Sequence, residues 1–501
     1  MSTPLDVLII GAGISGIGMA CHLQRDSPGS RFAIIDRRSR IGGTWDLFRY
    51  PGVRSDSDMF TFGYSFRPWH AFKVLADGAS IRSYLTDTAR EYDVERHIRF
   101  NRKVLRAEFS TASSLWTVTV LDEASGREER IQGRVLVNCT GYYNYDRGHD
   151  PDFPGQDAFK GQRIHPQFWP ENLDYAGKRV VVIGSGATAM TVVPAMADTA
   201  SKVTMVQRSP TYVFSIPGTD KIAKAMTRVM PKKWAFALTR ARNLALLRLM
   251  YFGSLRYPEM AKKLYIGSVR KALGEQADMR NWTPRYKPWD ERLCAVPDGD
   301  LFQAIKRGRA EVITAGIERF TEGGLKLDDG REIPADIIVT ATGLDVRVFG
   351  NITVAVDGQT VDPAQRLTYK ATLLEGLPNC AWIVGYINAP WTLKADIAAR
   401  YICRLVNHLK ASGSSRFVAV APPGEIADDN IFGGLKSNYV KRAASTLPRQ
   451  GRSGPWRVEH DYRRDKPILL EAPVDDGVLQ FVPAASASSD PTTAARTAAA
   501  A

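Results

Sequence analysis

Cysteine is scarce in this chain, and its copies are scattered. The five cysteines are distributed between Cys21 and Cys403, and none stands in a Cys-x-x-Cys or Cys-x-x-x-x-Cys pair. This spacing excludes a redox-active cysteine pair close in sequence and is typical of buried thiols in a reducing compartment. No metal site is predicted.

Long apolar runs are also absent. No uninterrupted apolar stretch approaches the ~20 residues that a membrane-spanning helix needs. The chain enters an apolar strand at Leu5 without the basic segment, apolar segment and cleavage site of a secretory signal. A cytoplasmic protein is therefore expected.

Acidic residues are few in one part of the chain. The formal net charge is +14, and between residues 218 and 287 sixteen lysines and arginines face four acids. Apolar residues recur there at helical spacing, as Trp234 and Leu238 do, so a helical insert is predicted. No nucleic-acid-binding motif accompanies the charge, and no nucleic-acid partner is expected. Two interpretations remain: solvated basic faces, or a peripheral contact with anionic membrane lipid.

The length and composition indicate a globular protein with several cores. With 501 residues, 44% hydrophobic and 24% charged, the chain is expected to form two or three domains. Residues 483–501 are rich in Ala, Ser, Thr and Pro and predict a disordered tail.

A strand, a glycine turn, a helix and an acid follow one another at the start of the chain. The apolar run 5–10 is typical of a strand buried on both faces of a parallel sheet. Gly11, Gly13 and Gly16 form a GxGxxG turn that lets backbone approach a pyrophosphate at a helix N-terminus. The next strand ends on Asp36, whose carboxylate can accept hydrogen bonds from a ribose. This unit predicts a dinucleotide site.

The same pattern returns in the middle of the chain. A strand at 178–183 leads into a second turn, with Gly184, Gly186 and Thr188, and with alanine in place of the third glycine. The following strand ends on Arg208 and Ser209 instead of an acid. A guanidinium can pair with a 2′-phosphate, so this second site is predicted to prefer NADPH over NADH.

A twelve-residue stretch, 159–170, joins the two units. It has the pattern Phe-x-Gly-x-x-x-His-x-x-x-Trp-Pro, carried by Phe159, Gly161, His165, Trp169 and Pro170. The pattern resembles the fingerprint of the Baeyer–Villiger monooxygenases, flavoenzymes that use NADPH and O2 to insert an oxygen atom beside a carbonyl group. The alternative is a proline-punctuated linker. Residues 42–52 are most similar to mycobacterial members of that family.

The resemblance implies roles for several residues. It assigns FAD to the first nucleotide site, with Gly43, Thr44 and Trp45 beside the flavin ring. It assigns the essential catalytic arginine to Arg292, and it implies that Asp56 hydrogen-bonds this arginine. From its sequence context alone, Asp56 could equally cap a helix. One departure is that family members often have a lysine just before the arginine, where this chain has Glu291.

The resemblance also implies a reaction. NADPH reduces FAD, O2 adds at the flavin C4a to give a peroxide, and the peroxide attacks a small ketone, which rearranges to an ester or lactone. The same oxidant can oxygenate a sulfide or thioamide. The alternatives are an N- or S-oxygenating flavin monooxygenase, and a non-catalytic nucleotide-binding or membrane-associated protein. The Trp169-Pro170 ending and Arg292 favour the first interpretation.

The expected architecture is of the α/β class, with two Rossmann-like dinucleotide-binding domains, for FAD and NADPH, and a helical insert. The boundaries we expect are these: the FAD domain at 1–141 and 379–482, the NADPH domain at 142–211 and 289–378, the insert at 212–288, and the tail at 483–501.

Overall fold

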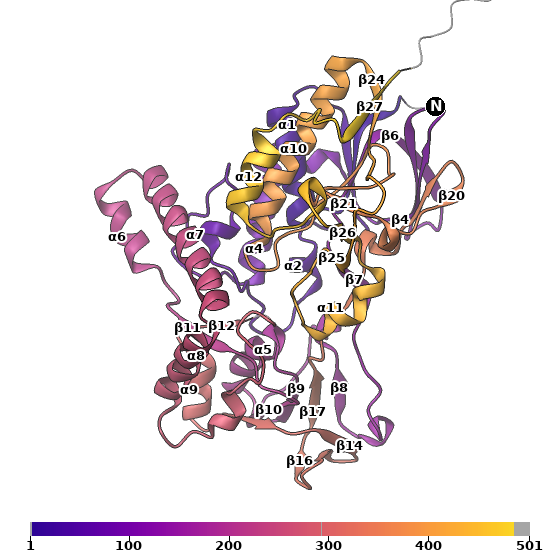
Figure 1. The fold of residues 1–501 in the computed structure, drawn as a ribbon. Helices are drawn as coiled ribbons and strands as arrows, with labels where there is room; N and C mark the ends of the chain where they lie inside the picture. Colours follow the sequence, from indigo (N-terminus) through magenta and orange to yellow (C-terminus); the bar gives the residue numbers. More distant parts are fainter. Residues whose placement is uncertain (1–2, 292, 485–501) are drawn as a thin grey trace, which may run out of the picture.

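A computed structural model describes residues 3–291 and 293–484 (Figure 1). Its largest sheet has a parallel centre in the order β23-β6-β1-β2-β3. Strand β1 has its last four residues buried, as expected of a strand covered on both faces. The central strands are β1 (Leu5–Ile10), β2 (Phe32–Ile35), β3 (Ile98–Arg99), β6 (Glu128–Asn138) and β23 (Cys380–Trp382).

Helices cover one face of this sheet and an antiparallel extension lengthens it. Helices α1 and α10 pack against each other, and α12 packs on α10. Strands β4, β5 and β6 are antiparallel neighbours, and β19 and β20 continue the sheet beyond β4. The bounds are α1 (Ile14–Asp26), α4 (Gly78–Glu91), α10 (Trp391–Ser412), α12 (Tyr462–Leu470), β4 (Arg102–Ser110), β5 (Leu115–Asp122), β19 (Thr353–Val356) and β20 (Gln359–Thr360).

The second sheet is parallel throughout and has the order β13-β10-β9-β17-β8. Alternate residues of β9 pack on opposite layers: Val180 and Val182 against α5 and α9, and Val181 and Ile183 against the ribbon β14–β16. The bounds are β8 (Gln162–Ile164), β9 (Arg179–Ile183), β10 (Lys202–Gln207), β13 (Ala310–Thr314), β17 (Ile337–Thr340), α5 (Ala187–Ala197), α9 (Asp300–Lys306), β14 (Ile317–Thr321), β15 (Gly324–Leu327) and β16 (Glu332–Pro334).

Three helices project from one side of the molecule, at the left of Figure 1: α6 (Lys221–Val229), α7 (Lys232–Arg256) and α8 (Pro258–Leu273). The stretch expected to be helical from residue 212 instead starts with strand β11 (Val213–Ile216), which pairs in parallel with β12 (Cys294–Pro297). Helix α7 is held against the unit of the largest sheet where Arg240 donates hydrogen bonds to the carbonyls of Phe60 and Gly63, at 2.8 and 3.0 Å.

The chain passes between the two sheets twice, and the two passages meet. Strand β7 (Tyr143–Gly148) follows the first Thr-Gly crossing, and β18 (Leu344–Val346) follows the second. They pair as an antiparallel ribbon, and helix α11 (Asn438–Ala443) packs beside β18. The C-terminal strand β27 (Leu479–Pro483) pairs with β24 (Ser414–Ala419), so Pro483 belongs to a strand and not to the expected tail. Residues 485–501 of that tail lie outside the described residues.

The two Rossmann-like sheets with a helical insert confirm the expected fold class. All five cysteines are buried, as predicted, and burial raises the pKa of Cys21 to about 12. No group of side chains in residues 3–291 and 293–484 is arranged to hold a metal ion. Over the same ranges, no helix is long and apolar enough to cross a membrane.

Candidate active site between the two glycine turns

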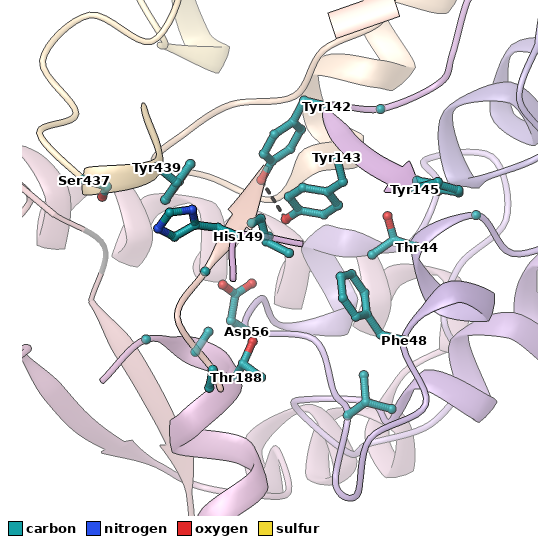
Figure 2. A pocket seen from close by; sticks show the side chains of 18 of the residues that line it. Thr44, Phe48, Asp56, Tyr142, Tyr143, Tyr145, His149, Thr188, Ser437 and Tyr439 are labelled. Atoms are coloured by element: carbon teal, nitrogen blue, oxygen red, sulfur yellow. Dashed lines mark hydrogen bonds between the residues drawn. The ribbon is translucent and has the colours of Figure 1, made fainter. Parts of the chain in front are cut away.

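One cavity of about 960 Å³ runs between the two glycine turns. Gly11 and Gly13 line it on one side, Gly184 and Gly186 on the other, and the residues of both Thr-Gly crossings lie between. Figure 2 shows the side chains of Asp56, Tyr143 and His149 around this space. The two predicted nucleotide sites therefore open into one shared space.

The first turn is built by close backbone contact. A Cβ on Gly16 would lie 1.8 Å from the carbonyl oxygen of Gly11, so only glycine allows α1 to start this close to the turn. No side chain caps the N-terminus of α1, whose N-cap is Gly13. The backbone N–H groups of the first turn of α1 therefore have no side-chain acceptor, and at the cavity wall they form a site suited to an anion.

Asp36 ends β2 beside this turn, as predicted. Its two carboxylate oxygens accept hydrogen bonds from the backbone N–H groups of Ala12, at 2.5 Å, and Arg38, at 2.7 Å. Burial raises the pKa of Asp36. Since each oxygen keeps a further lone pair and the residue lines the cavity, the carboxylate can still accept a hydrogen bond from a ligand hydroxyl.

The second turn is more open than the first. Gly184 approaches the other crossing so closely that a Cβ would lie 2.3 Å from the carbonyl oxygen of Ala341, whereas a Cβ on Gly186 would meet nothing within 4 Å. Helix α5 also starts without a side-chain cap. Beyond β10, Arg208 and Ser209 are exposed and line the cavity, and Ser185 Oγ donates to the carbonyl of Ser209 at 3.1 Å.

The segment that follows the first unit connects the two turns. A Cβ on Gly43 would lie 2.9 Å from Gly13 Cα, so this backbone packs directly on the first turn. The Thr44 side chain hydrogen-bonds with Tyr145, and Trp45 lines the cavity. Farther along, the Tyr50 hydroxyl hydrogen-bonds with Thr188 of the second turn, and burial raises the pKa of Tyr50 to about 12.

Asp56 lies on the cavity wall and is exposed. Ser57 Oγ donates a hydrogen bond to it at 3.4 Å. The capping role that its sequence context allowed belongs to Asp58, which accepts from the Thr61 N–H at the start of α3 (Met59–Phe62). Arg292, the predicted catalytic arginine, lies outside the described residues. Its neighbours in the chain, Glu291 and Leu293, both line the cavity.

The fingerprint residues do not line the cavity. They lie at the second sheet and at the strands β14–β16 that pack on it. Gly161 is required because a Cβ would lie 2.4 Å from the carbonyl oxygen of Asp336. The ring of Phe159 meets Phe320 edge-on at 6.2 Å. Trp169 is half-buried and packs on the core beneath α5, and Pro170 beside it is also half-buried. These contacts hold the linker to the second sheet.

His165 contacts both passages between the sheets. Its Nδ1 accepts from the Gln167 N–H at 3.2 Å, which leaves the proton on Nε2, and Nε2 lies 3.3 Å from the carbonyl oxygen of Gly343. A Cβ on Gly148, at the end of β7, would lie 2.0 Å from this ring. Burial lowers the pKa of His165, so the neutral ring is favoured.

Several residues that line the cavity had no role predicted from the sequence. Tyr142 and Tyr143 share a hydrogen bond of 2.9 Å between their hydroxyls (Figure 2). Tyr142 also stacks on Trp391, with the ring centroids 5.3 Å apart. Their position directly after a Thr-Gly crossing was a usable signal. Ser437 and Arg442, around α11, also line the cavity, and no local pattern marked them.

Comparisons with known proteins identify the family of this chain. Residues 5–349 match the family described as flavin-binding monooxygenase-like. The putative FAD-containing monooxygenase MymA of Mycobacterium tuberculosis is 53% identical over 493 residues, covering 97% of this chain and 99% of that protein. FAD-containing monooxygenase EthA of the same organism is 47% identical over 483 residues, covering 96% and 98%. The predicted similarity to mycobacterial enzymes is confirmed.

Solved structures confirm the fold. Oxidized steroid monooxygenase bound to NADP superimposes with a TM-score of 0.77 at 22% identity, covering 96% of this chain and 100% of that one. From its sequence relatives and the extent of the family match, the chain belongs to the flavin-binding monooxygenase-like family.

Proposed function

We propose that this monooxygenase is an FAD- and NADPH-dependent enzyme of the Baeyer–Villiger type, which converts ketones to esters or lactones. The observation that carries the proposal is the cavity shared by two helix N-termini without a side-chain cap, with a carboxylate at the end of one second strand and, near the end of the other, a guanidinium that forms no ion pair with any described residue. Bound reduced flavin would supply the activation of O2 for transfer of one oxygen atom.

The first turn suits FAD. The uncapped N-terminus of α1 would face the pyrophosphate, with Gly11, Gly13 and Gly16 allowing its approach. Asp36 would accept a hydrogen bond from the ribose. The backbone of Gly43, with Thr44 and Trp45, would lie along the flavin ring, because this segment packs on the first turn and lines the cavity.

The second turn suits NADPH. Gly184, Gly186 and Thr188 would surround the pyrophosphate at the start of α5, and Arg208 with Ser209 would hold the 2′-phosphate. Glu291 lies near enough to Arg208 for their charges to interact. Burial raises the pKa of Glu291, and the charges of Lys441 and Arg208 oppose that shift. A second guanidinium, that of Arg442, lines the same cavity and can support the phosphate where other family members use a lysine at 291.

Arg292 and Asp56 would carry the chemical step. Attack on a ketone develops negative charge on the reacting oxygen atoms, and a fixed guanidinium in a water-poor cavity lowers the cost of that charge. We propose that Arg292 supplies this charge and that Asp56, on the cavity wall, keeps it oriented. The partners are then O2 and a small ketone, or a sulfur compound in place of the ketone.

The test is to mix the NADPH-reduced holoenzyme with isotopically labelled O2 and a panel of ketones and thioethers, and to analyse products by mass spectrometry. We expect esters or lactones that carry one labelled oxygen. Arg292→Ala should keep its flavin and be reduced by NADPH, yet form almost no ester, because loss of one donor to a developing oxyanion costs ~3–4 kcal/mol.

The exposed Arg285 provides a control, since Arg285→Ala removes an equal charge nearby and should leave ester formation unchanged. Asp56→Ala should be impaired in the same step but less completely than Arg292→Ala. Normal ester formation by Arg292→Ala would overturn the assignment. A wild-type enzyme that oxygenates only sulfur or nitrogen would place the chain in the N- and S-oxygenating class.

A further inference from the structure

The helices α6, α7 and α8 expose an unusual amount of apolar surface. Of the fifteen large hydrophobic side chains that are exposed in the described residues, eleven lie between residues 222 and 264. The most exposed are Val229 at 81%, Leu249 at 70%, Leu264 at 66%, Trp234 at 63% and Ile222 at 61%. We call this surface of α6–α8 the apolar–basic face. Clustering of this kind marks an interaction surface, because isolated exposed hydrophobics would be spread over the whole molecule.

Helix α7 presents a continuous apolar stripe. Its opposite side is anchored, with Ala235 and Thr239 buried and Arg240 bonded to carbonyls of the unit of the largest sheet. On the outward side, exposed apolar residues recur at steps of three and four, which places them in one line along the helix. The members of this line are Trp234, Leu238, Ala241, Ala245, Leu249 and Phe252.

Helix α6 is amphipathic but does not bury its apolar side. Ile222, Met226 and Val229 follow one another at steps of four and three, and Lys221, Lys224 and Arg228 occupy another side. Ile222 and Val229 are exposed. In Figure 1, α6 lies at the outer edge of the molecule, next to α7. An apolar stripe flanked by lysine and arginine is the pattern of a helix that lies in a membrane interface.

The basic residues of these helices are available for a partner. Eleven lysines and arginines between residues 221 and 271 make no ion pair with any described residue, and of these Arg240 donates to backbone carbonyls. Arg242 pairs with Asp220 and Arg248 with Asp461. Among the unpaired ones are Lys224, Lys232 and Lys233. The charge of the face is thus strongly positive and not neutralised by the protein.

We propose that the apolar–basic face docks on an anionic lipid surface, with the α7 stripe inserted among the headgroups and the surrounding cations paired with lipid phosphates. A nucleic acid would match the cations but would leave the leucines in water. A second copy of the chain, packed across a two-fold axis, would bring the same cations against one another. The proposal is independent of the reaction.

The experiment is co-sedimentation of the full-length holoenzyme with vesicles of phosphatidylcholine, alone or mixed with phosphatidylglycerol. We expect binding to the anionic vesicles that weakens with salt, and little binding to the neutral ones. Lys232→Ala with Lys233→Ala should weaken binding at least tenfold, because each cation near such a surface contributes about a fivefold gain. Leu249→Ser with Phe252→Ser should weaken binding while the cations remain.

The matched control is Arg127→Ala with Arg130→Ala, which removes the same charge from the exposed β5–β6 hairpin at the other side of the molecule. This variant should bind like the wild type. Brominated lipids should quench tryptophan fluorescence of the wild type and much less that of Trp234→Phe. NADPH oxidation by each variant shows that it is folded.

Three results would overturn the proposal. The first is no binding of the wild type to anionic vesicles. The second is equal weakening by the control variant, which would mean that only net charge acts. The third is a concentration-dependent dimer, without vesicle binding, that Leu249→Ser with Phe252→Ser abolishes; the face would then be an interface between copies of the chain.

Discussion

The two glycine turns share a frame but differ at equivalent positions. In each, the first glycine donates its N–H to a carbonyl of the second strand, Gly11 to Ile35 and Gly184 to Val206, at 2.8 and 2.9 Å. This common bond makes Asp36 equivalent to Gln207. The carboxylate of Asp36 accepts from two backbone N–H groups. The Gln207 amide instead donates to the Asn281 carbonyl and to Thr314.

The next position is an arginine in both units, Arg37 and Arg208, but only Arg37 is paired with acidic side chains of the described residues. Arg37 forms ion pairs with Glu123 and Asp146, so its guanidinium is satisfied by the protein. The equivalent Arg208 forms no ion pair with any described residue and faces the cavity. One scaffold thus offers an acceptor for hydroxyls at its first site and an unsatisfied cation for an anion at its second. If the first site holds FAD and the second NADPH, as we propose, this difference, more than the shared glycines, distinguishes a ribose-binding position from a phosphate-binding one.

The substitution expected to have the largest effect on flavin content and folding lies where the two turns differ in packing. The first turn needs Gly16, whereas the second has the buried Ala189 at this position. Gly16→Ala would place a methyl group 1.8 Å from the Gly11 carbonyl oxygen, so we expect a protein purified without FAD or unable to fold. Ala189→Gly should cost only ~1 kcal/mol and keep the flavin. Flavin absorbance per protein and thermal unfolding measure both. Comparable losses in the two variants would contradict the packing difference.

The second-largest effect is expected at the equivalent positions Asp36 and Gln207, on FAD affinity and the free energy of unfolding. Asp36→Ala would leave the N–H groups of Ala12 and Arg38 without their buried acceptor, at ~1–3 kcal/mol for each, so FAD affinity and the free energy of unfolding should both fall. Gln207→Ala removes side-chain donors but leaves no backbone N–H unsatisfied, and we expect ~1 kcal/mol. Urea unfolding and flavin titration compare them. A larger loss for Gln207→Ala would show that the two positions are not used as we infer.

The third effect is on cofactor choice. A charge-assisted contact to a 2′-phosphate contributes ~1.5–3 kcal/mol. Arg208→Ala should therefore raise the Michaelis constant for NADPH by an order of magnitude or more and barely change that for NADH. Arg37→Ala, at the equivalent position of the other unit, is the matched control and should leave the NADPH to NADH ratio unchanged. Equal losses with both nucleotides in Arg208→Ala would refute a phosphate contact.

The parts that the sequence predicted are those that a short stretch determines. Strand, turn, helix and acid are contiguous, so Gly11, Gly13 and Asp36 could be placed from local pattern alone. Only geometry shows that Asp56 does not cap α3, because Asp58, two residues later, is the one that meets the first turn of that helix. Spacing of polar residues cannot distinguish these two carboxylates.

The parts that the sequence missed depend on distant segments. The cavity wall combines Tyr142 with Trp391 and with residues of α11, nearly three hundred positions farther along the chain. Strand β11 could not be predicted, because its partner β12 is separated from it in sequence by all three projecting helices. Such pairings depend on packing between segments distant in sequence, and the hydrophobic periodicity of either segment alone does not predict them.

The smallest effect is expected at the linker between the two turns, where His165 meets Gly343 and Gly148. His165→Ala should retain FAD and its reduction by NADPH, but it should oxidise more NADPH without product, because the two units are held less well after reduction. Phe168→Ala, at an exposed neighbour on the same turn, is the control. Product formed per NADPH consumed is the measurement, and an unchanged ratio in His165→Ala would make this histidine a packed linker residue only.

The ionisation of His165 gives this last prediction a pH dependence. Burial places its folded-state pKa below the ordinary value of 6.5, and Nδ1 must stay unprotonated to accept from Gln167. As the pH falls below 6.5, the unfolded chain takes up this proton before the folded one does. The contribution of His165 to stability is therefore full above pH 6.5 and is lost as the pH falls toward the folded-state pKa. Wild type should lose more stability over that range than His165→Gln, which cannot titrate. Identical pH profiles of thermal unfolding for the two would mean that the neutral ring is not what holds the crossings together.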